Sequence, residues 1–119
     1  MINQAKEQEI FYSKACESTL GSGCYVEKAL TVLGGKWAYL IIKHLFADKK
    51  RFGELRKLLH GVNARSLTMC LRNLEEQGIV TRTVIPTVPV TVEYSLTEKG
   101  RDLRDVIAAL YLFGEKWKL

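Results

Sequence analysis

The fold is decided by residues 52–78, which read FGELRKLLHGVNARSLTMCLRNLEEQG. The apolar spacing of residues 52–59 predicts a short helix, and Gly61-Val62-Asn63 predicts a tight connection after it. The asparagine that ends this connection is a good N-cap for a second helix over residues 64–77, and the final glycine ends that helix. Two helices joined by a short turn that contains glycine form a helix-turn-helix, so the segment predicts this motif.

The sequence changes from helical to alternating periodicity directly after the second helix. Residues 79–85 and 90–96 are rich in β-branched side chains and alternate along the chain, with Pro86-Thr87-Val88-Pro89 between them. This pattern predicts a β-hairpin with a tip that the prolines stiffen. The predicted fold is therefore mainly α with a small β-hairpin wing, a winged helix-turn-helix.

Helical periodicity also surrounds this motif on both sides. Apolar residues at helical spacing predict helices over residues 3–18, 24–33 and 36–47, and one long helix after Thr97, which caps it. Asp48-Lys49-Lys50 is expected to form a turn.

Three functional regions follow from this arrangement. We expect an N-terminal helical arm for dimerisation at residues 1–23, a DNA-binding winged helix-turn-helix at 24–97, and a C-terminal dimerisation helix at 98–119. The last helix has more apolar residues than a small domain covers alone, which favours a two-fold dimer. A monomer whose two terminal helices pack on each other is the alternative.

The positive charge is concentrated on the helix-turn-helix. The 119 residues carry a net charge of +5, from 18 Lys and Arg against 13 Asp and Glu. Between Lys36 and Arg72, nine basic residues face only Asp48 and Glu54, so this segment carries +7 and the remainder −2. Such a distribution is typical of an anion-binding face, and a basic face that is merely solvated is the alternative.

The exposed side of the second helix follows from its leucines. Leu67, Leu71 and Leu74 form one apolar stripe. The other side carries the residues that we expect to contact DNA, namely Arg65, Ser66, Thr68, Met69 and Arg72. Arginine suits phosphate or guanine, and the shorter hydroxyl side chains suit other hydrogen bonds in the major groove.

Further basic residues flank this helix. We expect them to hold the DNA backbone and to make binding steeply dependent on salt. They are Lys36, Lys49, Lys50, Arg51, Arg56 and Lys57.

Four motifs occur in order along the chain: CYVEKALTVLGGKW at 24–37, RFGELR at 51–56, LTMCLRNLEEQGIV at 67–80 and VEYSLTEKG at 92–100. Together they resemble the HxlR-type winged helix-turn-helix transcriptional regulators, over about residues 24–117. The resemblance implies a bacterial or archaeal cytosolic homodimer that binds a pseudo-palindromic operator as a repressor or activator. Several members of that family respond to oxidants, quinones or aldehydes through cysteine.

The resemblance also implies roles for single residues. The family's DNA-facing positions correspond to Arg65, Thr68 and Arg72, with the wing tip at Pro86–Pro89. Many members have a basic or polar residue in place of Cys70, and a basic residue just after the wing prolines. This chain has Val90-Thr91 there, which argues against strong contact of the wing with the minor groove. Arg82 is then the nearest cation of the wing and its candidate DNA-contacting residue.

Cys24 is the candidate redox-sensing residue. It stands at a predicted helix start, where the helix dipole favours a thiolate, and the resemblance places the family's commonly redox-active cysteine there. A small buried residue or a plain N-cap is the alternative. Cys70 is expected to pack beside the leucine stripe, and Cys16 to fill the dimer interface or to act as a resolving thiol.

The sequence favours neither an enzyme nor a metalloprotein. No nucleotide-binding or catalytic motif occurs, and neither His44 nor His60 has a partner at metal-ligand spacing, so we expect no cofactor and no metal. No run approaches the roughly 18 apolar residues of a membrane span, and the start lacks the apolar core of a signal peptide. We expect a cytoplasmic protein.

The sequence therefore predicts a DNA-binding transcriptional regulator that senses oxidants or electrophiles, such as quinones and aldehydes, through Cys24. Two alternatives remain open. One is a ligand-responsive regulator without cysteine sensing, with an apolar pocket at the dimer interface. The other is a winged-helix protein-interaction module that does not read DNA.

Overall fold

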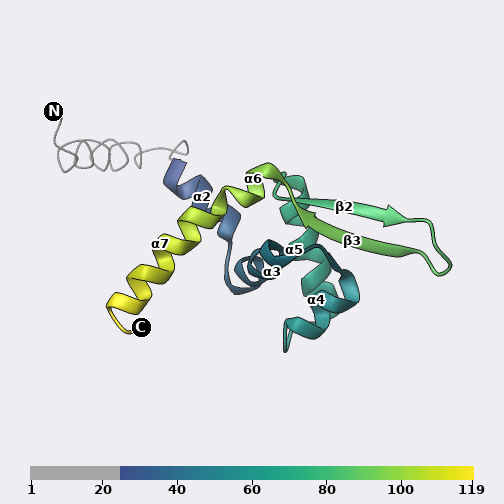
Figure 1. Ribbon diagram of the computed structural model, residues 1–119, viewed down its shortest axis with the longest axis horizontal. Helices are drawn as coiled ribbons and strands as arrows, with labels where there is room; N and C mark the ends of the chain where they lie inside the picture. Colours follow the sequence, from purple (N-terminus) through teal and green to yellow (C-terminus); the bar gives the residue numbers. More distant parts are fainter. Residues whose placement is uncertain (1–24) are drawn as a thin grey trace. The chain divides into compact units, whose positions relative to one another are not determined.

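The computed structural model describes residues 25–119, so the predicted arm at 1–23, with its helix at 3–18, and Cys24 lie outside the described residues (Figure 1). The chain divides into two compact units, Met1–Gly34 and Gly35–Leu119. In the first unit the structure describes α2 (Tyr25–Leu33), as the sequence predicts, and none of its residues is buried.

The second unit contains a three-helix core. It is built from α3 (Lys36–Ala47), α4 (Phe52–Leu58) and α5 (Ala64–Glu76). Its nine most deeply buried large side chains are Ile41, Ile42, Leu45, Leu55, Leu59, Leu67, Leu71, Leu74 and Ile79. The predicted leucine stripe of α5 is therefore confirmed, and it leaves the other side of α5 free to carry polar residues.

Both ends of α5 are formed as the sequence predicts. The Asn63 side chain accepts a hydrogen bond of 2.8 Å from the backbone N–H of Ser66. After Gln77 the chain turns at Gly78, whose φ of 74° lies in the left-handed region that favours glycine. These two signals fix the start and the end of the helix on which the candidate site is built.

The wing belongs to a three-stranded antiparallel sheet of order β1-β3-β2. Strands β2 (Val80–Ile85) and β3 (Thr91–Leu96) form the predicted hairpin. The third strand is β1 (Lys50–Arg51). The sequence predicts a turn at Asp48-Lys49-Lys50, and this prediction is wrong at Lys50, which begins the strand. Lys50 pairs with Tyr94 and Arg51 with Glu93, so the strand is defined by pairing with a distant segment.

The predicted long C-terminal helix is divided into α6 (Glu98–Arg101) and α7 (Leu103–Lys116) at Asp102. Thr97 caps α6 as predicted, accepting a hydrogen bond of 3.0 Å from the Gly100 N–H. The break has a local cause, since Asp102 has a ψ of −17°, closer to a 3₁₀ turn than to an α-helix. No residue of α7 is buried, and no described helix is long and apolar enough to cross a membrane.

Candidate nucleic-acid interface

The side of α5 opposite the leucine stripe faces solvent. Arg65, Thr68, Met69 and Arg72 are exposed there, and Ser66 is partly exposed. The hydroxyl of Thr68 donates a hydrogen bond of 2.7 Å to the Ala64 carbonyl. Its oxygen therefore remains an acceptor for an incoming ligand.

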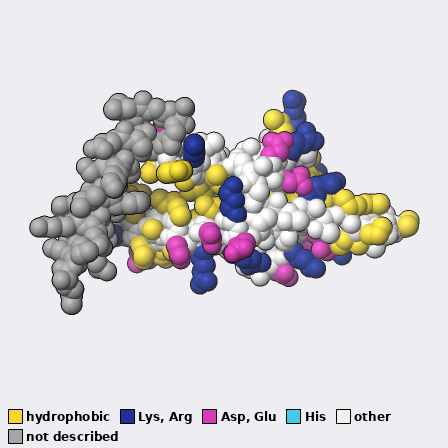
Figure 2. Space-filling model, turned by 90° about the horizontal axis from the view of Figure 1, so that it is seen from above, with side chains coloured by type: hydrophobic (Ala, Val, Ile, Leu, Met, Phe, Trp, Pro, Cys, Tyr) yellow, Lys and Arg dark blue, Asp and Glu magenta, His cyan; other side chains and the backbone are white. Residues whose placement is uncertain are grey.

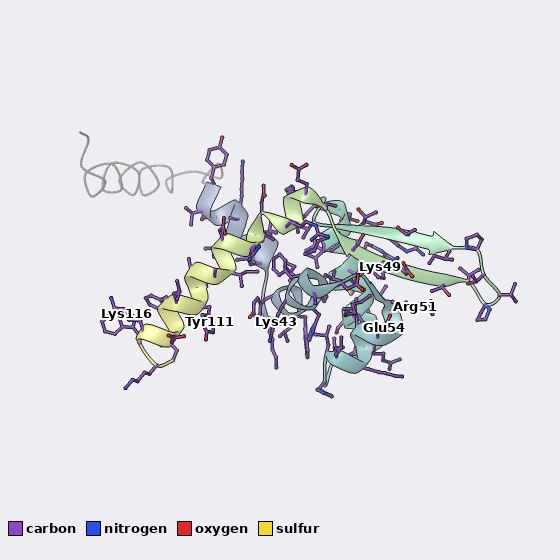
Figure 3. All side chains as sticks on the ribbon, in the orientation of Figure 1. Lys43, Lys49, Arg51, Glu54, Tyr111 and Lys116 are labelled. Atoms are coloured by element: carbon purple, nitrogen blue, oxygen red, sulfur yellow. The ribbon has the colours of Figure 1, made fainter. Side chains whose placement is uncertain are left out.

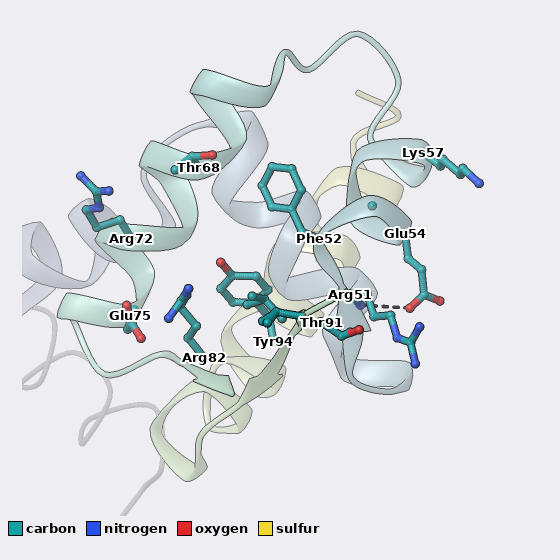
Figure 4. A pocket seen from close by; sticks show the side chains of 13 residues that line it. Arg51, Phe52, Glu54, Lys57, Thr68, Arg72, Glu75, Arg82, Thr91 and Tyr94 are labelled. Atoms are coloured by element: carbon teal, nitrogen blue, oxygen red, sulfur yellow. Dashed lines mark hydrogen bonds between the residues drawn. The ribbon is translucent and has the colours of Figure 1, made fainter. Parts of the chain in front are cut away.

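A groove of about 860 Å³ lies between α5, the start of α4 and the wing (Figure 4). It is lined by Arg51, Phe52, Gly53, Glu54, Lys57, Thr68, Arg72, Glu75, Arg82, Val90, Thr91, Val92 and Tyr94. Segments that are far apart in the sequence thus form one surface. Of the predicted DNA-contacting residues, the structure brings Arg51, Lys57, Thr68, Arg72 and Arg82 into this groove.

The groove is basic at its edges and aromatic between them. Arg72 and Arg82 lie on one side in Figure 4, and Lys57 lies on the other, with the rings of Phe52 and Tyr94 between them. The lining holds four cations and two carboxylates, and one carboxylate, Glu54, accepts a hydrogen bond of 3.0 Å from the Arg51 N–H. The arrangement suits a polyanion with an apolar component, such as a sugar–phosphate backbone.

An ion-pair cluster fixes the basic edge formed by β1. A carboxylate oxygen of Glu93 on β3 lies 3.4 Å from the ammonium of Lys49, and the other lies 3.9 Å from the Nε of Arg51. Figure 3 shows Lys49 and Arg51 close to each other next to the hairpin, with Glu54 of α4 beside Arg51. The side chain of Glu93 is only 16% exposed, so the sheet holds it in place.

Several predicted residues lie outside the groove. Arg65, Ser66 and Met69 remain on α5, and Arg56 is exposed on α4. Lys36 starts α3, with its ammonium 5.0 Å from the centre of the Trp37 ring. The structure does not place these five residues among those that line the groove.

Sequence reasoning missed Phe52, Tyr94 and Glu93. Tyr94 could have been found, because it falls on the buried side of an alternating strand. No sequence signal identifies Glu93, because its partners belong to a strand that only the folded sheet defines.

The surroundings of Cys70 and His44 do not indicate a reactive or metal-binding site among residues 25–119. Burial raises the pKa of the Cys70 thiol, and the residue is half-buried beside the leucine stripe, as expected for packing. The pKa of His44 is lowered by burial and by the nearby charges of Lys43 and Lys50. Among residues 25–119, no cluster of three His, Cys, Asp or Glu side chains could hold a metal ion.

A helix-turn-helix followed by a hairpin that shares a basic groove with its second helix defines the winged helix-turn-helix class of DNA-binding proteins. Residues 32–119 match the family described as HxlR-like helix-turn-helix, and the chain belongs to that family.

Related proteins support the same assignment. The HTH-type transcriptional regulator YdeP of Bacillus subtilis (strain 168) is 49% identical over 96 residues, which cover 81% of this chain and 75% of YdeP. The structure of the oxidized redox regulator HypR superposes with a TM-score of 0.72 at 45% identity, covering 78% of this chain and 96% of that one. The structure of reduced YodB of B. subtilis superposes with a TM-score of 0.70 at 37% identity, covering 76% of this chain and 88% of YodB. The chain is a DNA-binding transcriptional regulator and not an enzyme.

Proposed function

We propose that this regulator binds a two-fold symmetric operator as a homodimer, with α5 in the major groove and a cysteine as its sensor. One observation carries the placement of α5: its solvent-facing side presents Arg65, Thr68 and Arg72 opposite a fully buried leucine stripe. An α-helix fits the B-DNA major groove, and residues of its N-terminal half reach base edges.

The residues of α5 divide by position. Arg65 and Ser66 lie in its first turn, and we assign Arg65 to a guanine or a phosphate. Thr68 has its hydroxyl hydrogen engaged, so it accepts from an adenine or cytosine amino group. Met69 is 60% exposed and suits apolar contact, for example with a thymine methyl.

We assign the remaining cations to the DNA backbone. Arg72 and Arg82 converge on the groove from α5 and β2, so one phosphate can contact both. Arg51, Arg56 and Lys36 would hold phosphates farther along, and each neutralised phosphate adds about 0.9 to the salt slope.

The apolar face of α7 supports the homodimer. Leu110, Phe113 and Trp117 are each more than half exposed in the single chain, at helical spacing on one face. A second copy of α7 would cover them. A two-fold dimer would then place two α5 helices about 34–36 Å apart, one turn of DNA.

We assign the sensing role to Cys24. Two structural relatives, HypR and YodB, are described in oxidized or diamide-treated forms. Cys24 immediately precedes Tyr25, where α2 begins, and a helix start favours a thiolate, whereas burial raises the pKa of the Cys70 thiol. Modification at residue 24 would shift α2 and change the spacing of the two α5 helices, which lowers operator affinity.

Binding to a duplex selected by the parent protein from a random-sequence pool tests the DNA contacts. Arg65→Ala should weaken binding by about 1–3 kcal/mol, and Arg72→Ala, which removes a phosphate contact, should weaken binding and reduce the salt slope by about 1. Arg101 is exposed on α6, and Arg101→Ala is the control for lost charge. Unchanged binding by both α5 variants would show that α5 does not read the DNA.

The sensor is tested separately, with mild diamide or quinone treatment followed by peptide mass spectrometry. We expect modification at Cys24 and loss of binding in the parent and in Cys70→Ser, but retained binding in Cys24→Ser. Release of DNA by treated Cys24→Ser would assign sensing to another residue.

A further inference from the structure

The tip of the wing is apolar and carries no charge. No Lys, Arg, Asp or Glu occurs between Arg82 and Glu93. Val88 is fully exposed at the tip, and on the two sides of the hairpin Val84 is 49% and Val90 63% exposed. Figure 2 shows hydrophobic side chains gathered at the end of the wing, with Lys and Arg side chains farther from that end.

The tip is also held in one conformation by its own hydrogen bonds. The Thr87 N–H donates to the Ile85 carbonyl at 2.8 Å, and the Thr87 hydroxyl donates to the Pro89 carbonyl at 2.8 Å. The same hydroxyl lies 3.1 Å from that of Thr91. Because these polar groups bond to one another, the tip presents apolar surface that is already ordered before binding.

The wing is continuous with the proposed DNA surface. Val90, Thr91 and Val92 line the same groove as Thr68 and Arg72 of α5. Each strand has six residues, and six residues of β-strand span about 20 Å. The neighbouring minor groove lies about 17 Å along the axis, half of the turn that separates major-groove half-sites, so the tip is long enough to reach it.

We propose that the wing tip is an apolar wedge for the DNA minor groove, with Val88 as the leading side chain. The proposal rests on the proposed placement of α5 in the major groove. An uncharged tip gains nothing from the negative potential of a narrow A-tract groove. It is suited instead to a step that opens easily, such as TA or CA/TG, where apolar side chains insert between bases. The wing tip then contributes to sequence preference, whereas the salt dependence of binding comes from the basic residues behind it.

Three variants of Val88 test this on the duplex selected by the parent protein. Val88 is fully exposed, so its side chain buries no surface in the fold. Each variant should therefore keep the parent's unfolding midpoint. Val88→Ala should lower affinity about three- to tenfold without changing the salt slope, and Val88→Asp should lower it more than tenfold. Val88→Lys should steepen the slope by about 0.9, the value for one added phosphate contact.

The matched controls place the same charges at Ala108, which is exposed on the side of α7 opposite Leu110, Phe113 and Trp117. Ala108→Asp and Ala108→Lys should bind like the parent, which separates a local effect from net charge. A second readout replaces the adenine of the flanking TA or CA/TG step with 2-aminopurine. Its fluorescence should rise on binding of the parent, because the step unstacks, and rise less with Val88→Ala.

The outcomes separate the wedge from the proposed function. If all three Val88 variants bind like the parent while Arg65→Ala loses affinity, α5 reads DNA and the wedge is wrong. If the Val88 variants change affinity with no rise in 2-aminopurine fluorescence, the tip lies near DNA without entering a base step, which also overturns the wedge. If Arg65→Ala binds every selected duplex as tightly as the parent does, the proposed placement of α5 in the major groove is wrong, and with it the basis of the wedge.

Discussion

The carboxylate of Glu93 lies 3.4 Å from the ammonium of Lys49 and 3.9 Å from the Nε of Arg51, and so joins the central strand of the sheet to its short edge strand. Both basic side chains are about 60% exposed, whereas Glu93 is 16% exposed. The partly buried Glu93 carboxylate is held by the sheet, and its two exposed partners remain accessible to solvent. The two cations are thereby held beside each other at the edge of the sheet.

Glu93→Gln should remove most of the salt dependence of stability at this edge. Exposed ion pairs contribute about 0–1 kcal/mol each and are screened by salt. In urea titrations, the free energy of unfolding of the parent should therefore fall by a few tenths of a kcal/mol from low to high NaCl. The free energy of unfolding of the variant should fall by less. Glu76→Gln is the control, because Glu76 is exposed on α5 and makes no ion pair among residues 25–119. Equal salt dependence of Glu93→Gln and the parent would show that the pairs contribute nothing.

Gly100→Ala should destabilise the fold. A Cβ at Gly100 would collide with the Ile79 carbonyl oxygen and press on the Leu96 side chain, so α6 would have to move off the sheet. Overpacking of this kind costs about 1–3 kcal/mol, which exceeds the gain of up to about 1 kcal/mol in helix propensity. Urea denaturation measures the difference.

The control for Gly100 is Gly53→Ala in α4, where a Cβ would meet nothing within 4 Å. That variant should be no less stable than the parent. If Gly100→Ala were equally stable, the close approach of α6 to the Gly78–Ile79 turn would not be a constraint on the fold.

Local signals explain which parts of the fold the sequence predicts. The N-cap at Asn63, the glycine at Gly78 and the α5 leucine stripe each act within one turn of helix, and all three are confirmed. Strand β1 has two residues and exists only because it pairs with β3, so periodicity cannot reveal it. The break at Asp102 is also hidden, because neither glycine nor proline marks it.

The same distinction applies to the candidate site. The exposed side of α5 follows from its own spacing, so Arg65, Thr68 and Arg72 could be chosen from the sequence. The groove joins α4, α5 and the wing, and its aromatic residues Phe52 and Tyr94 come together only through the tertiary fold. Sequence reasoning therefore finds the exposed side of one helix but not the surface that several elements share.

Cys70 should react slowly with iodoacetamide in the folded protein. Burial raises the pKa of its thiol, so less thiolate is present near neutral pH than in the unfolded chain. The raised pKa also makes the free energy of unfolding depend on pH. The contribution of the Cys70 thiol is complete below the pKa that the thiol has in the unfolded chain, and it is lost as pH rises through the pKa in the folded protein. Alkylation followed by mass spectrometry at pH 7 and pH 9, with and without urea, measures the reaction rate of the thiol in the folded and in the unfolded chain. Equal rates with and without urea would show that the thiol is not protected.

Leu110→Glu should convert the proposed dimer to a monomer without unfolding it. Leu110 is 54% exposed on α7, so a charge there costs the single chain little but would be buried unpaired against a second copy. Sedimentation velocity at micromolar concentration should show the loss of the dimer, and the selected duplex should bind much more weakly because two half-sites are no longer read together. Ala108→Glu introduces the same charge on the opposite side of α7 and should remain dimeric. A dimer that persists in Leu110→Glu would exclude this face of α7 as the contact between subunits.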